Sequence, residues 1–369
     1  MVRAAVMTGP GQPIQVRALD PPEPEPGAVV LETLFSEVCG TDCHLRHGKL
    51  AGVPYPIIPG HVSVGRIAAM GSPLQDVDDV PFQVGEVVAF LDVHGTCGQC
   101  WFCTVAKAST RCPHRRVYGI TYSADEGLLG GWAESIYLRP GVRMLHLPPE
   151  VTPEIYIAAG CGLPTAFHAV ERADIRMGDT VAVQGTGPVG LASVVLSRMR
   201  SATQVIALGA PALRLDLARA FGADEVIDIG SVESGARAAA VRDLTHGRGA
   251  DVVIEASGNP HAVPEGLAMA RDNGTYVVVG QYTDYGDIPI NPHLGINKPH
   301  LDVRGCWGCD FSHLYRGIKM LARSAPWVPW TDAISGRYAL DEADQAMDDV
   351  EQLRVVKAVI EPHREARPT

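Results

Sequence analysis

Several features that define other protein classes are missing from this sequence of 369 residues. No run approaches the roughly 18 to 20 apolar residues that a helix needs to cross a bilayer, so we expect no membrane span. Basic residues are not in excess: the formal net charge is −11, which argues against a large nucleic-acid surface. The segment from Met1 to Met7 reaches Gly9 without the long apolar region of a signal peptide. We therefore expect a cytoplasmic protein that binds neither membranes nor nucleic acids.

Internal repeats and low-complexity segments are also absent. The composition is instead that of a globular protein rich in turns, with 46% hydrophobic residues, 20% charged residues, 39 glycines and 28 prolines. The length suggests two domains, each with a well-developed core.

The chain changes character near residue 160. Before this point, apolar segments alternate with Gly/Pro turns, which predicts strands over 29–38, 64–70, 85–91 and 134–138. From residue 180 onward, apolar runs alternate with helical stretches, which predicts a parallel sheet with helices on both faces. The runs are 180–184, 205–208, 251–256 and 275–279, and the helices are 188–200, 211–222, 235–245 and 260–270. The last two predicted elements are a helix over 340–353 and a strand over 354–360.

Four of the nine cysteines fall within sixteen positions. Their spacing, C-x2-C-x2-C-x8-C, indicates metal ligands in a protein without signs of secretion, because a reducing cytosol keeps thiols unpaired. Four thiolates would hold zinc in a closed, structural site. An iron–sulfur cluster and unliganded thiols remain alternatives, although ferredoxin runs place the fourth cysteine after about three residues. The four residues are Cys97, Cys100, Cys103 and Cys112.

A glycine-rich turn between a predicted strand and a predicted helix opens the second part of the chain. It reads G-x-G-x-x-G: the first glycine permits a tight turn, the second lets the backbone approach a pyrophosphate, and the third lets the helix pack on the strand. Such a run can be an ordinary turn, but its context favours a dinucleotide site. The candidate cofactor contacts are Gly185, Thr186, Gly187, Pro188, Val189 and Gly190.

Selectivity between NAD and NADP depends on the end of the next strand, about 20 residues on, where an acidic residue favours NAD. Here the strand ends at Gly209, which removes both the hydrogen bond to the ribose and the repulsion of a 2′-phosphate. No Ser-Arg pair follows to hold a phosphate. Arg214 could contact the ribose or a phosphate, or be an exposed helix arginine. On balance, we expect NAD rather than NADP.

Three distant segments supply further metal-ligand types: Cys39-Gly-Thr-Asp-Cys-His44, Gly60-His61 and Ala158-Ala-Gly-Cys161. Taken singly, a buried cysteine or a histidine after glycine is unremarkable. Together with the four-cysteine loop and the glycine-rich turn, these segments resemble the zinc-dependent medium-chain alcohol dehydrogenases over nearly the full length. The resemblance implies that Cys39, His61 and Cys161 bind a catalytic zinc, which makes two zinc ions per chain.

The same resemblance implies a mechanism. Thr41 would take the proton of an alcohol held at the catalytic zinc and pass it through the nicotinamide ribose to His44, because a histidine pKa near neutrality suits a relay. Hydride would then move from the alcohol carbon to the nicotinamide ring. Asp42 would orient His61, or else cap a helix. The remaining expected cofactor contacts are Thr165, Arg354 and Lys357.

The resemblance also implies an architecture and a class of enzyme. A Rossmann-type, doubly wound parallel sheet over 161–305 would be inserted into a β-rich, GroES-like catalytic domain made of 1–160 and 306–369, with a zinc lobe at 95–115. The α/β protein would be a homodimer or homotetramer that oxidises a small alcohol, a secondary alcohol or a polyol, with NAD(P). A carbonyl reductase with the same residues and a non-catalytic dinucleotide-binding protein are the alternatives. One position departs from the family, because Val62 stands where a glutamate often follows the zinc histidine.

Overall fold

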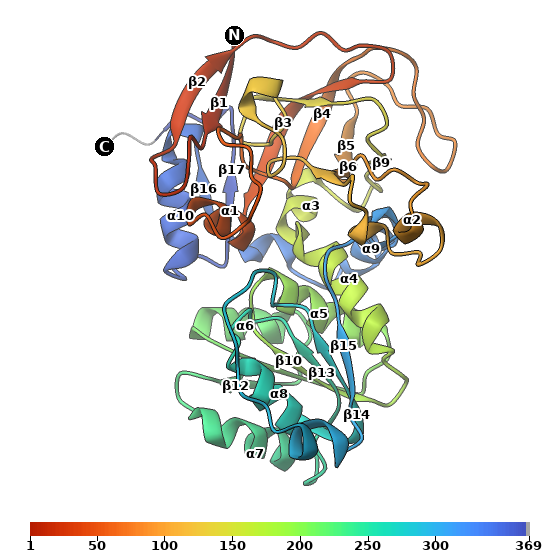
Figure 1. Ribbon diagram of the computed structural model, residues 1–369, viewed down its shortest axis with the longest axis vertical. Helices are drawn as coiled ribbons and strands as arrows, with labels where there is room; N and C mark the ends of the chain where they lie inside the picture. Colours follow the sequence, from red (N-terminus) through yellow and green to blue (C-terminus); the bar gives the residue numbers. More distant parts are fainter. Residues whose placement is uncertain (367–369) are drawn as a thin grey trace. The chain divides into compact units, whose positions relative to one another are not determined.

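The computed structural model describes residues 1–366 and divides into two compact units (Figure 1). The first unit comprises Met1–Gly160, Asp310–Ala322 and the segment from Ile334 onward, and the second comprises Cys161–Cys309 and Arg323–Ala333. The second unit begins at Cys161, and the chain first returns to the first unit at Asp310. Among the described residues, no helix combines the length and apolar character needed to cross a membrane.

The first unit is built on a seven-stranded sheet with the order β16-β17-β3-β4-β5-β9, in which β8 also pairs with β3. All neighbours are antiparallel except β16 and β17. Aliphatic and aromatic side chains such as Leu31, Ile67 and Tyr118 form one buried core around it. The strands are β3 (Val29–Val38), β4 (Ser63–Met70), β5 (Val87–Phe90), β8 (Ser135–Leu138), β9 (Met144–His146), β16 (Ile334–Tyr338) and β17 (Lys357–Ile360).

Shorter elements complete this unit. Two-stranded sheets join β1 (Val2–Val6) to β2 (Gln15–Leu19) and β6 (Val93–His94) to β7 (Arg116–Val117). The helices are α1 (Gly40–Arg46), α2 (Trp101–Thr104), α3 (Pro153–Ala159), α10 (Ala343–Glu351) and most of α9 (Phe311–Ser324).

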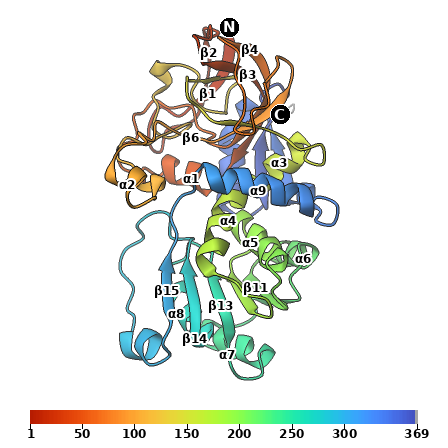
Figure 2. The same cartoon turned by 90° about the vertical axis from the view of Figure 1, so that its right-hand side faces the viewer.

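The second unit is a six-stranded parallel sheet with the order β12-β11-β10-β13-β14-β15. Figure 2 labels four of its strands, β11, β13, β14 and β15. The order reverses between β10 and β13, and parallel crossovers are right-handed, so the helices of the two halves lie on opposite faces. The strands are β10 (Thr180–Gln184), β11 (Gln204–Gly209), β12 (Glu225–Asp228), β13 (Ala250–Glu255), β14 (Ala270–Val278) and β15 (Asp302–Gly305). The helices are α4 (Gly162–Ala173), α5 (Pro188–Met199), α6 (Ala212–Ala220), α7 (Ser234–Leu244) and α8 (Ala262–Met269).

The predicted fold class is therefore confirmed, and most predicted elements appear within a few residues of their expected ends. The C-terminal strand is an exception, because it begins at Lys357 rather than at Arg354. Leu353 has a left-handed backbone (φ 55°) and turns the chain between α10 and β17. The N–H groups of residues 354 and 355 then donate to the Asp349 carbonyl and that of Val356 to the Ser335 hydroxyl, rather than to the backbone of a neighbouring strand.

Candidate active site and metal centres

The three ligands expected at a catalytic metal are brought together. The ligand atoms of Cys39, His61 and Cys161 all lie within 4.8 Å of one another, and Cys39 Sγ is 3.8 Å from His61 Nε2. Cys39 and His61 belong to the first unit, and Cys161 follows directly on Gly160, the last residue of that part of the chain.

Local geometry explains how Cys39 and His61 are presented. Cys39 is the N-cap of α1, and its Sγ accepts a hydrogen bond from the Thr41 N–H at 3.3 Å. His61 follows Gly60, whose backbone is left-handed (φ 86°) and whose absent side chain leaves room for Ser36 and Trp132. Only glycine fits this turn, and the turn places the His61 imidazole next to the Cys39 thiol.

Asp42 ties the two segments together. Its carboxylate accepts hydrogen bonds from the Cys39 N–H at 2.9 Å and from the Gly60 N–H at 3.4 Å. The first bond caps helix α1, which is the second of the two roles predicted for Asp42. The second bond reaches Gly60, the residue before His61. Burial raises the pKa of Asp42 well above its usual range. Orientation of the His61 ring by Asp42 stays a prediction.

The donor set fits zinc. Thiolate sulfur and imidazole nitrogen are the donors that Zn²⁺ prefers, and three protein ligands leave one tetrahedral position for a substrate. Burial would lower the pKa of His61, but nearby Cys39 and Asp42 outweigh it and raise this pKa to about 10. Asp92, which the sequence did not single out, adds to this effect. A basic imidazole is a good metal ligand.

The two expected relay residues lie on α1. Thr41 is in its first turn and His44 is three residues later, so both are on one side of the helix. Both side chains are half-buried. Burial, helped by the charge of Lys49, lowers the pKa of His44 from its ordinary value. The imidazole is therefore neutral near pH 7 and able to accept a proton.

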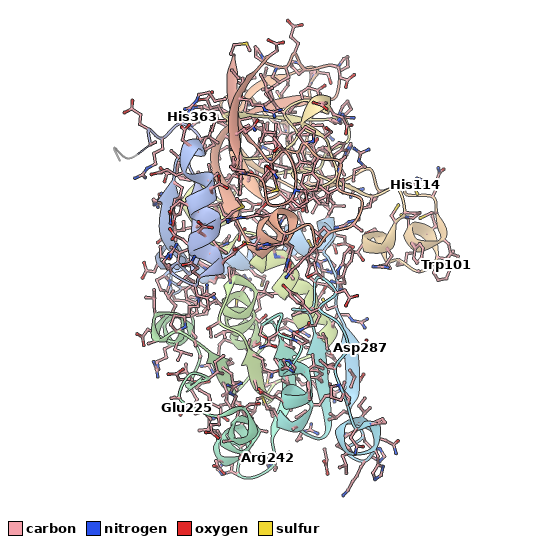
Figure 3. The ribbon with its side chains drawn as sticks, turned by 60° about the vertical axis from the view of Figure 1, so that its left-hand side comes forward. Trp101, His114, Glu225, Arg242, Asp287 and His363 are labelled. Atoms are coloured by element: carbon pink, nitrogen blue, oxygen red, sulfur yellow. The ribbon has the colours of Figure 1, made fainter. Side chains whose placement is uncertain are left out.

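The four-cysteine segment forms a separate lobe with a second ligand cluster, and Trp101 and His114 lie at its surface (Figure 3). Its four sulfur atoms lie within 4.8 Å of one another, and none is in a disulfide. Backbone N–H groups of Gln99 and Cys100 lower the pKa of the Cys97 thiol to about 6, which favours a thiolate ligand. Four sulfurs leave no position for a substrate, so this cluster suits a structural zinc.

The glycine-rich turn has the geometry of a phosphate cradle. Gly185 is left-handed (φ 102°), and a Cβ on Gly190 would overlap the Gly185 carbonyl oxygen. Gly187 caps α5 and faces open space, because the nearest atom to a Cβ built there is an Arg214 guanidinium nitrogen at 3.9 Å. The buried Thr186 hydroxyl has no hydrogen-bond partner within the protein. The N-terminus of α5, the open space at Gly187 and an unpaired hydroxyl fit a bound dinucleotide.

The other expected cofactor contacts are distributed between the two units. Thr165 lies on α4, whose first residue, Gly162, packs against Pro188 at the start of α5. A Cβ on Gly209 would overlap the Thr186 side chain, so the end of β11 also borders the glycine-rich turn. Arg354 belongs to the first unit, where its Nε donates to Asp349 at 2.5 Å. Lys357 is buried and paired with Glu37.

Sequence reasoning overlooked Glu37, although it carried a signal. It is a charged residue next to the last residue of β3, and its neighbours in that strand, Ser36 and Val38, are buried as it is. Its partner Lys357 stands 320 residues away, so only the fold could bring the two together.

Comparison with known families agrees with the geometry of both units. Residues 25–149 match the model of the alcohol dehydrogenase GroES-like domain, and residues 188–323 match that of the zinc-binding dehydrogenases. A relative, the 5-exo-hydroxycamphor dehydrogenase of Pseudomonas putida, is 32% identical over 92% of this chain and 93% of its own length. The chain therefore belongs to the zinc-dependent medium-chain alcohol dehydrogenase family.

Solved structures agree. An alcohol dehydrogenase from Thermotoga maritima superposes with a TM-score of 0.93 at 30% identity, covering 98% of this chain and 99% of its own. A zinc-binding dehydrogenase from Sinorhizobium meliloti, bound to NADP, has a TM-score of 0.85 at 28% identity, covering 98% and 99%. The protein is thus an enzyme, a zinc-dependent oxidoreductase that transfers hydride between an alcohol and a nicotinamide cofactor.

Proposed function

We propose that the reaction takes place at Cys39, His61 and Cys161 and that the substrate is a secondary alcohol or a polyol. The convergence of these three ligand atoms within 4.8 Å is the observation that carries the proposal. Zinc bound there would act as a Lewis acid that lowers the pKa of an alcohol hydroxyl. The hydroxycamphor dehydrogenase among the relatives supports an alcohol on a bulky apolar skeleton.

The chain's own residues would move the proton. Thr41 would accept it from the substrate hydroxyl, and the hydrogen bond from its backbone N–H to Cys39 Sγ supports this role. His44, neutral because burial lowers its pKa, would then receive it one helical turn further along α1. Asp42 would keep the Cys39 and Gly60 backbones in place through its two hydrogen bonds.

Metal analysis together with an activity screen tests the proposal. The purified protein should contain two zinc ions per chain, one in each ligand cluster. It should also reduce the cofactor, measured by absorbance at the nicotinamide band, with one or more of four alcohol classes: primary, secondary, cyclic and polyhydric. A single zinc per chain, with no hydride transfer from any of these classes, would overturn the proposal.

We further infer that NAD is preferred over NADP. The Arg214 guanidinium lies near Gly187 in the glycine-rich turn, a place suited to the pyrophosphate rather than to a 2′-phosphate. The end of β11 offers no serine or arginine within its last residue and the two that follow, Gly209-Ala-Pro211. A higher kcat/KM with NADP than with NAD in the unchanged protein would contradict this preference.

A carboxylate at position 209 should strengthen the preference for NAD. A Cβ there would overlap the Thr186 side chain, including its Cβ at 2.8 Å, so the informative variant is Thr186→Gly/Gly209→Asp, with Thr186→Gly alone as its control. Two unit charges about 4 Å apart repel by about 4 kcal/mol near a protein surface, partly screened by salt. The kcat/KM ratio of NADP to NAD should therefore fall at least about tenfold relative to the control. An unchanged ratio would place the ribose elsewhere.

Two further features bear on the oligomeric state of the protein and on its cellular compartment. Strand β15 is an edge of the parallel sheet, and its Val303 is 42% exposed. An open, partly apolar edge invites pairing with a second copy, so we expect a dimer or tetramer joined through the second unit, with a mass that is a multiple of 39.3 kDa. None of the nine cysteines is in a disulfide, which suits a reducing compartment such as the cytoplasm.

A further inference from the structure

One ion pair in the first unit is almost completely shielded from solvent. Lys357 Nζ donates to Glu37 Oε1 at 2.6 Å, and each side chain is only 1% exposed. The pair joins adjacent strands, because Val359 of β17 is in register with Glu37 of β3. Buried ion pairs seldom add stability compared with well-packed apolar residues. Stability alone therefore gives a weak reason for placing two charges here.

Glu37 contacts all three segments that carry the ligands of the catalytic centre. It lies on β3, two residues before Cys39, which follows the end of that strand. Its N–H donates to the Val62 carbonyl at 2.9 Å, directly after His61. Its carboxylate packs against Gly160, directly before Cys161: a Cβ on Gly160 would overlap both Glu37 Oε2 and Lys357 Nζ.

Gly160 is also constrained by its backbone. Its φ of 49° with ψ of −143° is a combination that residues with a side chain rarely adopt. This residue ends α3 and turns the chain into Cys161. The shape of that turn is thus fixed on one side by its own dihedral angles and on the other by the charged groups packed against its Cα.

We propose that Glu37 and Lys357 are positioning residues for the zinc centre: the ion pair fixes the turn at Gly160, and with it the approach of Cys161 to Cys39 and His61. Neither side chain touches the substrate in this role. Removing the charges should loosen one ligand segment and make the metal easier to lose, as happens when groups that support metal ligands are replaced. The inference rests on the proposed catalytic zinc site.

The test uses the zinc-loaded full-length enzyme and the variant Glu37→Gln/Lys357→Met, which removes both charges at similar volume. Zinc release into excess chelator is followed with a colorimetric metal indicator. Two phases are expected, one per site, and Cys161→Ser identifies the phase of the catalytic site. The lobe zinc serves as a reference within the same molecule. The matched control is Arg3→Met/Asp341→Asn, an ion pair of the first unit with a spacing of 2.5 Å and exposed side chains.

We expect release from the catalytic site to be about tenfold or more faster in Glu37→Gln/Lys357→Met, with the lobe phase unchanged and the control pair without effect. The absorption bands of the enzyme loaded with Co²⁺ at the catalytic site should shift as well. Unchanged release and unchanged bands would overturn the inference, and so would equal acceleration of both phases, which signals general loosening. A wild-type enzyme that contains only the lobe zinc would instead overturn the proposed catalytic site.

Discussion

Replacing Cys161 by serine should lower kcat/KM for the alcohol by about a thousandfold or more, while the protein remains folded. A serine hydroxyl is a poor zinc ligand, so the Cys39–His61–Cys161 cluster loses one of its three ligands. A thousandfold loss corresponds to about 4 kcal/mol of transition-state stabilisation, within what a Lewis-acid metal supplies. Steady-state kinetics at the nicotinamide band and zinc content measured on the same sample check the result.

The control for this variant is Cys306→Ser. Cys306 is a buried cysteine of the second unit that belongs to neither ligand cluster. Its replacement should leave two zinc ions per chain and change kcat/KM less than about threefold. A Cys161→Ser enzyme that keeps both zinc ions and full activity would show that Cys161 is not a ligand.

Much of this site was predictable because its parts are local motifs. The glycine-rich turn, the Cys39–His44 segment and the four-cysteine lobe each lie within a short stretch of sequence, where spacing reports geometry directly. The prediction that Cys39, His61 and Cys161 lie together was less direct. It rested on a resemblance to a family, since no local rule brings positions 39, 61 and 161 together.

What remained hidden depends on contacts between distant strands. The Glu37–Lys357 pair exists because β3 lies beside β17, the last strand of the chain. Which unit residues 306–309 and 323–333 join is decided by packing rather than by composition. The roles of charged residues in buried strands are therefore the hardest to assign from sequence.

Replacing Thr41 by valine should lower kcat/KM about a hundredfold to a thousandfold, whereas Thr41→Ser should retain most of the activity. Valine keeps the shape of threonine but has no hydroxyl to accept the substrate proton, and positioned acid–base groups contribute factors of about 10² to 10⁴. Zinc content should stay at two per chain in both variants, because the N–H that donates to Cys39 Sγ belongs to the backbone and is kept in both. A fully active Thr41→Val enzyme would exclude the hydroxyl from the reaction.

The pH dependence of alcohol oxidation then separates His44 from Thr41. His44 accepts the proton only when its imidazole is neutral, and burial lowers its pKa below the ordinary value. Oxidation should therefore hold its rate at neutral pH and decline as the pH falls through this lowered pKa, because protonation removes the acceptor. In His44→Asn, that decline should disappear and the rate at neutral pH should fall about tenfold or more. If the acidic limb of the pH profile survives in His44→Asn, the titrating group is another residue and the proton leaves the site by a different path.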